Sequence, residues 1–237
     1  DAKLITPKKV HSGSILLSRQ FLNFEAIDSQ KYVSIPLNNL QKIFSRKYLM
    51  LDTAIEIFTT DNMAYLFDLV RGQRKGLLVK IQRLKIPSLE FIQVNYYDIQ
   101  PLVQKATEDW IDGRLTNFDY LMQLNIYAGR TYNDLSQYPV FPWVIGDYNS
   151  DKLDLENPSS FRDLGLPIGA MNEERLASLQ ERMQFDPNNR YLYSSFYSSA
   201  AVVIGYLIRL EPFASLHIEL QSGRFDHKDR LFLSLPR

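Results

Sequence analysis

The first third of the chain is a series of short apolar-rich runs separated by turn residues. Gly13 and the pair Asp28–Ser29 mark turns between the runs. Regularly spaced short strands of this kind are typical of a small antiparallel barrel or sandwich. The pattern predicts strands over residues 4–10, 14–18, 21–26, 32–36, 42–48, 53–58 and 64–69.

A helical period follows the last predicted strand. Leu77, Leu78, Ile81 and Leu84 recur at helical spacing, and basic residues lie off this stripe. We therefore expect one amphipathic helix to close a first domain of residues 1–86. Strands capped by a single C-terminal helix resemble the layout of a pleckstrin-homology-like (PH-like) domain.

Residues 87–105 join the two halves of the chain, and they are too apolar for a flexible spacer. The apolar side chains are Leu89, Phe91, Ile92, Val94, Tyr96, Tyr97 and Ile99. A connection that buries its own side chains fixes the domains on either side of it. The sequence predicts a packed linker and a rigid two-domain arrangement.

The second half, residues 106–237, shows mainly helical patterns. Thr116 and Asp119 have the form of a capping box before a helix that reaches Gly129. Further helices are expected after Asn172, from Ser198 or Ser199 to before Pro212, and from about residue 213 to residue 221. The predicted fold class is α+β, a small antiparallel β-barrel or sandwich with a C-terminal helix followed by a mainly α-helical domain.

Residues 130–147 depart from both periods. Two prolines exclude a helix or a central strand, while the aromatic rings carry apolar area that folding would hide. We expect extended, irregular chain buried in a core, with Tyr138 and Trp143 among its rings. Buried chain without a ladder needs side-chain partners for its backbone groups. The candidates are Arg130, Asn133, Asp134 and Gln137, with direct contact to a partner peptide as the alternative.

Composition and charge limit the class of protein. The hydrophobic fraction of 45% is typical of a globular core, and 27 basic residues balance 27 acidic ones. No global field recruits nucleic acid. The absence of cysteine agrees with a cytosolic location. No secretory leader pattern follows Asp1, and the apolar run 200–208 is too short to cross a bilayer.

Basic residues in the first domain are candidate contacts with anionic membranes. One group lies near the first predicted strand and the other on the helix, where a solvated helical face is the alternative. The candidates are Lys8, Lys9, Arg74, Lys75, Lys80 and Arg83. Few cations converge at the first strand, which argues against a phosphoinositide pocket.

Arg46 and Glu56 lie on consecutive predicted strands and can pair across them. An exposed pair would contribute only about 0–1 kcal/mol to stability. A surface pair on one sheet face and a role in docking another domain both remain open from the strand pattern alone.

The chain lacks the patterns of common active sites. His11, His217 and His227 have no short metal-ligand spacing, and neither a phosphate loop nor a nucleophile elbow is present. The acidic residues between Asp147 and Glu156 lack the spacing of a calcium loop and read as solvated turns. We expect no catalytic residues, no bound metal and no cofactor.

Several motifs in the second half resemble the signature of the BEACH domain. They include Asn117-Phe118-Asp119-Tyr120-Leu121, Tyr132-Asn133-Asp134-Leu135, Gln137-Tyr138-Pro139-Val140-Phe141-Pro142-Trp143, Phe161-Arg162-Asp163-Leu164, Arg209-Leu210-Glu211-Pro212-Phe213 and Phe225-Asp226-His227. The resemblance covers residues 106–237 and implies a domain whose C-terminal part is missing. It also implies a preceding PH-like module that docks closely, with Arg46 and Glu56 on the docking face.

The chain departs from that family where Ser194-Ser195-Phe196 replaces a motif with histidine, and where the connection 182–191 is short. The resemblance implies a non-enzymatic scaffold of a large cytosolic protein, peripheral to endomembranes, with WD40 repeats downstream. Its partners would be proteins of vesicle trafficking, lysosome-related organelles or autophagy, bound at the groove between the domains. A phospholipid-directed membrane adaptor that uses the basic residues is the alternative.

Overall fold

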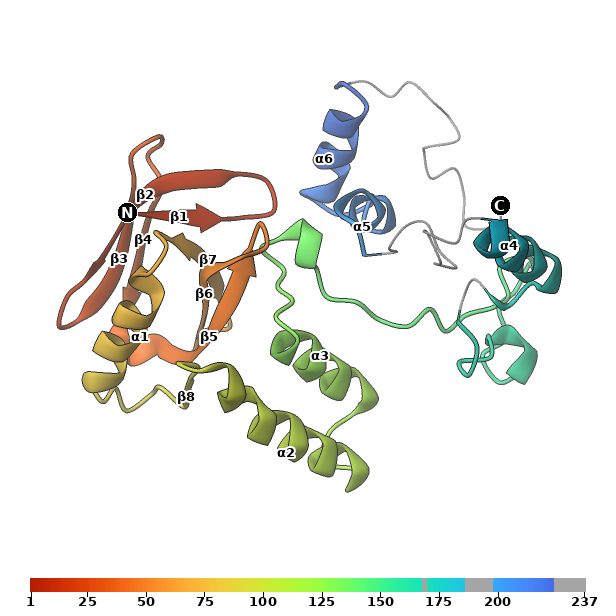
Figure 1. Ribbon diagram of the computed structural model, residues 1–237, viewed down its shortest axis with the longest axis horizontal. Coiled ribbons are helices and arrows are strands. Elements are labelled where there is room, and N and C mark those ends of the chain that lie inside the picture. The colour runs from red at the N-terminus through yellow and green to blue at the C-terminus, as the bar shows by residue number, and fades with distance from the viewer. Residues whose placement is uncertain (168–169, 186–197, 224–237) are drawn as a thin grey trace. The chain divides into compact units, whose positions relative to one another are not determined.

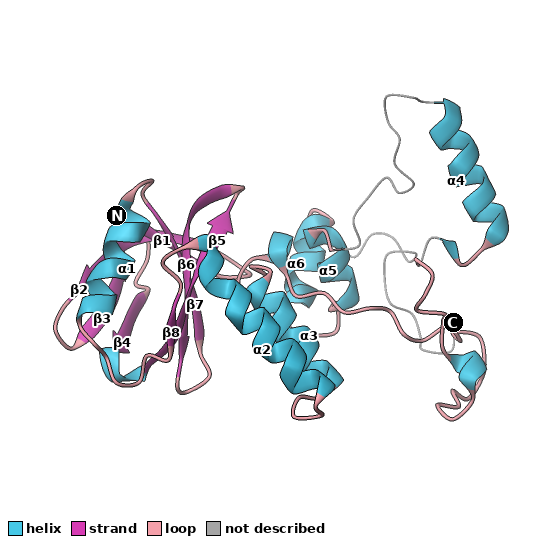
Figure 2. Cartoon of the chain, turned by 60° about the horizontal axis from the view of Figure 1, so that its bottom comes forward, coloured by secondary structure: helices cyan, strands magenta, loops and turns pink. Residues whose placement is uncertain are grey.

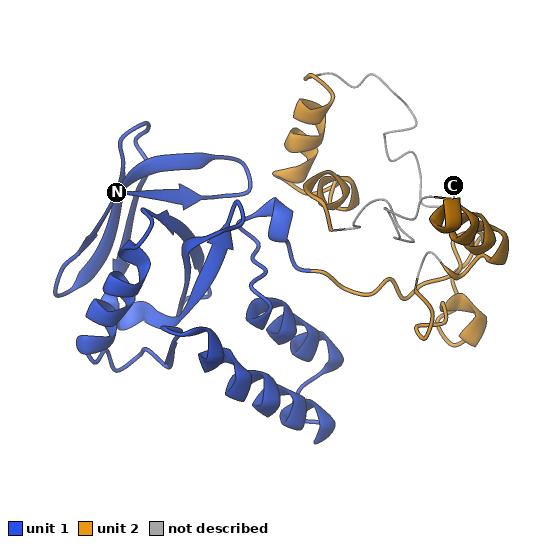
Figure 3. Ribbon diagram, in the orientation of Figure 1, with its two compact units in different colours: residues 1–139 blue, residues 140–237 orange. Residues whose placement is uncertain are grey.

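The computed structural model of the chain describes residues 1–167, 170–185 and 198–223. The chain divides into two compact units, residues 1–139 (unit 1) and residues 140–237 (unit 2) (Figure 3). Unit 1 contains a β-sheet and three α-helices, and the described part of unit 2 contains three more α-helices (Figure 2).

Unit 1 is built on one curled sheet of eight strands in the order β4-β3-β2-β1-β7-β6-β5-β8 (Figure 1). Neighbouring strands run antiparallel except β5 and β8, which pair in parallel. The sheet is therefore mixed and not purely antiparallel as predicted, because the predicted linker supplies β8. The strands are β1 (Ala2–Ile5), β2 (Val10–Leu17), β3 (Phe21–Ala26), β4 (Tyr32–Pro36), β5 (Leu40–Tyr48), β6 (Leu51–Thr59), β7 (Ala64–Leu69) and β8 (Phe91–Ile92).

The core of unit 1 lies between the curled sheet and one helix. Strand β3 shows the underlying pattern, since Leu22 and Phe24 are fully buried while the residues between and beside them are not. Helix α1 (Gln73–Arg83) adds Leu78 and Ile81 to the same cluster. The predicted closing helix is thus present, and it packs on a sheet that contains most of the predicted strands.

The predicted strand over residues 4–10 is wrong. The chain turns between β1 and β2, where the Thr6 hydroxyl accepts a hydrogen bond from the Lys9 amide and donates one to the Lys9 carbonyl. Pro7 lies in this turn and has no amide to contribute to a ladder. Gly13 is not a turn either, because it lies inside β2, where a Cβ atom would come within 2.1 Å of the Glu25 carbonyl oxygen.

The predicted linker contributes regular structure to unit 1. Leu89, Ile92 and Val94 pack against the sheet core, whereas Tyr96 and Tyr97 are 82% and 71% exposed. After a 3-10 turn, η2 (Tyr96–Ile99), helix α2 (Gln100–Ile111) begins inside the predicted linker, and helix α3 (Asn117–Tyr127) packs against it. Thr116 caps α3 by accepting a hydrogen bond from the Asp119 amide, as the capping box predicts.

The described part of unit 2 contains α4 (Glu173–Phe185), α5 (Ala200–Tyr206) and α6 (Phe213–Leu220), together with the short turn η4 (Pro158–Ser160). Asn172 caps α4 by accepting a hydrogen bond from the Arg175 amide, as expected. Helix α5 ends at Tyr206, earlier than predicted, and α5 and α6 pack together. The motif Ser194-Ser195-Phe196, most of the 182–191 connection and His227 lie outside the described residues.

Candidate docking and binding site

Arg46 and Glu56 form a buried ion pair in the sheet of unit 1. The register of β5 and β6 places Phe44 opposite Glu56 and Arg46 opposite Ala54, so the two charged residues are diagonal neighbours. The Arg46 Nε atom lies 2.7 Å from the Glu56 Oε2 atom, and the side chains are 2% and 1% exposed. Of the two alternatives that the strand pattern left open, the surface pair is therefore excluded. Burial lowers the pKa of the Arg46 guanidinium, and the Glu56 carboxylate opposes that shift.

Thr131 completes this buried group. Its hydroxyl donates to the Glu56 Oε1 atom at 2.5 Å, so Glu56 binds Arg46 through one oxygen and Thr131 through the other. Thr131 is 3% exposed. The sequence pattern does not single out Thr131, although Thr131 follows Arg130 directly and Asn133 comes two positions later. The available signal was a hydroxyl within a stretch already predicted to satisfy buried polar groups.

The residues after Thr131 also reach the sheet. The Asn133 Nδ2 atom donates to the Ala64 carbonyl at 3.3 Å, and the Gln137 Nε2 atom donates to the Lys47 carbonyl at 2.8 Å. The segment 131–137 therefore contacts β5, β6 and β7 within unit 1. Two of the four polar side chains proposed to bind backbone groups thus do so on the sheet.

Arg130 and Asp134 bind within their own segment. The Arg130 Nη1 atom donates to the Tyr138 carbonyl at 2.9 Å, and Asp134 accepts from the Ser136 amide at 2.9 Å. The rings of Tyr132 and Tyr138 lie edge to face at 5.1 Å. All four polar residues of the stretch therefore serve backbone groups.

Part of the predicted aromatic core is not buried in this structure. Tyr132, Phe141 and Trp143 are 47%, 38% and 36% exposed, so the expectation of a buried aromatic segment is wrong for these rings. Trp143 belongs to unit 2, where its ring lies edge to face with that of Tyr206 at 5.1 Å.

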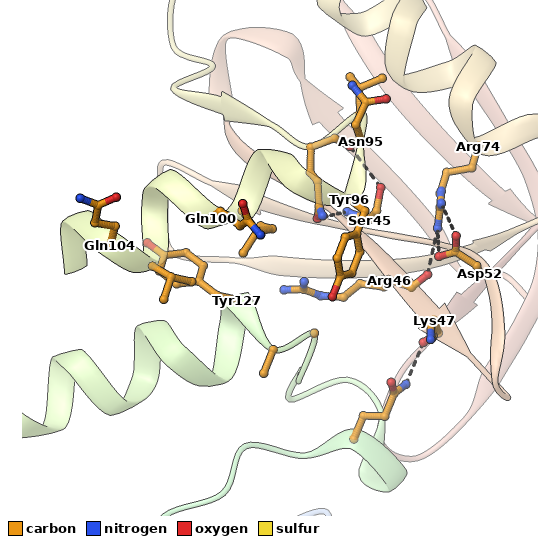
Figure 4. Close-up of a pocket in the computed structure, with 17 residues that line it drawn as sticks. Ser45, Arg46, Lys47, Asp52, Arg74, Asn95, Tyr96, Gln100, Gln104 and Tyr127 are labelled. Carbon is orange, nitrogen blue, oxygen red and sulfur yellow. Dashed lines mark hydrogen bonds and ion pairs between the residues drawn. The ribbon is translucent and has the colours of Figure 1, made fainter. Parts of the chain in front are cut away.

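A cleft of about 690 Å³ lies in unit 1 beside this contact (Figure 4). Its walls come from β5, from the chain after β8, from α2 and from the end of α3. Val94, Ile99 and Val103 supply apolar surface, and amide side chains alternate with them. Figure 4 shows the Arg46 side chain extending toward Tyr127. The Arg46 Nη2 atom is buried and has no hydrogen-bond partner among the described residues.

The basic residues proposed as membrane contacts fall into two groups. Arg74 binds the Asp52 carboxylate through both of its terminal nitrogens, at 2.5 and 2.8 Å, and its side chain is only 19% exposed. Arg74 is therefore paired with a carboxylate and is not a freely solvated cation, while membrane contact by these residues stays a prediction. The remaining candidates are exposed, namely Lys8 and Lys9 in the β1–β2 turn and Lys75, Lys80 and Arg83 on α1.

The described residues contain no group of three or more His, Asp or Glu side chains placed to hold a metal ion. Asp147 instead accepts hydrogen bonds from the Asn149 and Ser150 amides in a local turn. Hydrogen bonds from Ser150 and Asn149 lower the pKa of Asp147. None of the helices described here combines the length and apolar character that crossing a bilayer requires.

Two family descriptions match the chain. "PH domain associated with Beige/BEACH" matches residues 2–82, and "Beige/BEACH domain" matches residues 108–237. BEACH domain-containing protein B from Arabidopsis thaliana is 39% identical over 215 residues, which cover 84% of this chain and 8% of that protein. The solved C-terminal domain of an unknown protein from Leishmania infantum has a TM-score of 0.32 and 16% identity, over 35% of this chain and 81% of that one. That likeness is too low to carry an argument.

Proposed function

The chain belongs to the Beige/BEACH domain family, as the resemblance predicted, and we propose that it is a non-enzymatic scaffold unit that binds protein partners. In this proposal residues 1–86 form the PH-like domain, residues 87–105 a packed linker and residues 106–237 the BEACH domain. The chain spans 8% of the length of its Arabidopsis relative, so the unit would act within a much larger protein.

The observation that carries this proposal is the buried contact of Glu56 with Arg46 and Thr131. Arg46 and Glu56 come from the PH-like part, while Thr131 comes from the BEACH part. A buried charged pair is expensive to desolvate and weak evidence for stability alone. The hydrogen bond from Thr131 to the second carboxylate oxygen of Glu56 supports a role for the pair in docking the two parts and in shaping the adjoining cleft.

We place the scaffold at the cytosolic face of endomembranes, in vesicle trafficking, lysosome-related organelles or autophagy, with WD40 repeats downstream. This placement rests on the family alone. Neither family description names an enzyme. Recognition through shape, hydrogen bonds and charge is the chemistry that the cleft and its surroundings offer.

The test is affinity capture with the full chain as bait and quantitative mass spectrometry as the readout. Thr131→Val removes the hydroxyl that reaches Glu56, and Thr131→Ser keeps it as the matched control. We expect the wild type and Thr131→Ser to retain a common set of cytosolic proteins that Thr131→Val loses. Retention of the same proteins by all three chains would contradict the role of the contact.

Liposome sedimentation separates the scaffold from the membrane adaptor. The exposed cations Lys75, Lys80 and Arg83 on α1 are the residues to reverse. The scaffold predicts little sedimentation with phosphatidylserine liposomes, with no change on reversal. Strong, salt-sensitive sedimentation that charge reversal abolishes would favour the adaptor instead.

A further inference from the structure

The hairpin between β5 and β6 has an unusual turn. Tyr48 pairs with Leu51, which leaves Leu49 and Met50 as the two turn residues, with φ angles of 46° and 66°. A two-residue hairpin turn with positive φ at both positions favours Asn-Gly, because side chains such as those of Leu and Met are strained there. The residues at this turn are therefore poorly suited to its backbone.

The same turn exposes large apolar side chains. Leu49, Met50 and Leu51 are 69%, 92% and 58% exposed, in consecutive positions. These side chains add little to the stability of the fold, because they bury little surface and Leu49 and Met50 strain the backbone of the turn. Strain and exposed apolar surface at one position together indicate contact with another molecule.

The hairpin tip leads directly into the cleft. Lys47 and Asp52, at the base of the hairpin, both line the cleft. Asp52 is already bound by Arg74 through two hydrogen bonds. Lys47 has no ion pair with a described carboxylate, although its charge helps to lower the pKa of Asp52. The net charge that the cleft presents on this side is therefore positive.

Arg46, which lines the cleft, carries a buried donor without a hydrogen-bond partner in the described part of the chain. Arg46 is only 3% exposed, and its Nη2 atom has no hydrogen-bond partner among the described residues. A buried donor without an acceptor is rare in native proteins. An acceptor oxygen of a bound molecule in the cleft would satisfy it.

We propose that the hairpin tip and the cleft form one binding surface, the tip–cleft surface, for an extended peptide with a carboxylate next to a large apolar side chain. The carboxylate binds near Lys47, a peptide or carboxylate oxygen accepts from Arg46, and the apolar side chain packs on Leu49 and Met50. This inference rests on the proposed function and specifies the chemistry of the partner. A flat bilayer surface cannot place an acceptor on a buried guanidinium, which favours a peptide over a membrane.

The experiment selects ligands from a phage-displayed library of random short peptides, with the full chain immobilised. We expect the selected peptides to be enriched in Asp or Glu beside Leu, Ile, Met or Phe. A synthetic peptide of the selected sequence then serves as the probe in fluorescence anisotropy with purified variants of the full chain.

The charge variant is Lys47→Glu, and Lys9→Glu is its control because Lys9 is exposed in the β1–β2 turn, away from the cleft lining. We expect Lys47→Glu to lower the affinity for the probe by about tenfold, as loss of a close charge pair does. A probe with Lys in place of its carboxylate should regain affinity for Lys47→Glu. Lys9→Glu should bind like the wild type.

The tip variant is the double substitution Leu49→Asn and Met50→Gly, which supplies the residues that the turn favours. Its melting temperature should rise, while its affinity for the probe falls by about fivefold or more as apolar contact is lost. Leu16→Asn is the control, because Leu16 is also an exposed leucine, on β2. A loss of binding together with a gain in stability cannot come from misfolding.

Selected peptides without acidic residues, or unchanged affinity in both Lys47→Glu and the tip variant, would overturn the tip–cleft surface. Sedimentation with phosphatidylserine liposomes that the tip variant abolishes would overturn it in favour of a membrane. Either result leaves the scaffold intact if Thr131→Val still loses protein partners that Thr131→Ser retains. Failure of that comparison would instead count against the proposed function itself.

Discussion

At the scale of single residues, Glu56 is the centre of the contact between the sheet and the segment after α3. It is 1% exposed and uses both carboxylate oxygens, one on Arg46 and one on Thr131. A buried carboxylate is tolerated only when its charge is paired and its lone pairs are occupied. Each of the three residues therefore depends on the other two.

Thr131→Val should destabilise the chain by about 1.5–3 kcal/mol, because a buried hydrogen bond to a charged group is lost while the side-chain volume is kept. Chemical denaturation monitored by circular dichroism measures this. Thr131→Ser, which keeps the hydroxyl, should lower the free energy of unfolding by clearly less. Equal stability of Thr131→Val and the wild type would mean that the hydroxyl contact is absent in solution.

Arg46 and Glu56 should behave as a coupled pair. Arg46→Met leaves a buried carboxylate without its counter-charge and should cost about 3–5 kcal/mol, as should Glu56→Met for the converse reason. The double variant should lose less than either single variant. A double-mutant cycle with additive losses would show that the two side chains do not interact.

Charge reversal at either residue would place two like charges in the buried site. It would therefore disturb the sheet directly, whereas Thr131→Val removes only one hydroxyl from the contact. This follows from the burial of the pair, which the strand pattern did not reveal.

At the scale of elements, the Arg74–Asp52 pair joins the start of α1 to β6. Hydrogen bonds from Arg74 lower the pKa of Asp52 below its ordinary value of 3.8. A lowered folded-state pKa means that the pair stabilises the fold above that value and that the stabilisation is lost as the pH falls through the lowered pKa. Because the Asp52 side chain is 64% exposed, solvent screening keeps the contribution small.

Asp52→Asn should therefore lower the stability of the chain by about 0.2–1 kcal/mol at neutral pH. The difference from the wild type should shrink toward zero as the pH falls below the ordinary range of an aspartate. Urea denaturation at a series of pH values measures it. A difference that stays constant or grows toward acid pH would exclude this origin.

The elements also show which parts of the fold can be read from sequence. Strands β3, β4 and β7 occur where the apolar runs predict them, and Thr116 caps α3 as its sequence indicates. These features depend on local pattern and local hydrogen bonds. The β1–β2 turn is hard to read from sequence because the apolar residues Ile5 and Val10 stand on either side of Thr6-Pro7-Lys8-Lys9 and suggest one continuous strand. Gly13 resembles a turn residue, although it lies in β2, where β3 approaches too closely for a side chain.

The candidate site shows the limit of such reading. Arg46, Glu56, Asn133 and Gln137 could be singled out by residue type and resemblance. Thr131 could not, because its role depends on a carboxylate 75 positions away. The Arg74–Asp52 pair is likewise hidden from the sequence, because only the packing of α1 on the sheet brings Asp52 to Arg74.

At the scale of the whole chain, unit 1 is one compact body that contains the sheet, α2, α3 and the segment 131–137. Two family descriptions cover different parts of this body, since one ends at residue 82 and the other begins at residue 108. The compact unit therefore crosses the boundary between the two family descriptions. In the proposed scaffold, this compact unit would hold the cleft and the hairpin tip in a constant relation.

Hydrogen–deuterium exchange of the full chain, followed by mass spectrometry, tests this central claim most directly. The amides of Thr131 and Gln137 donate to backbone carbonyls, and those of Asn133 and Ser136 donate to side chains of the same segment. Slow exchange is expected over residues 131–137 in the wild type and in Thr131→Ser. Faster exchange is expected there and in β5 and β6 for Thr131→Val, with β2 and β3 unchanged. Fast exchange over residues 131–137 in the wild type would contradict the joining of this segment to the sheet.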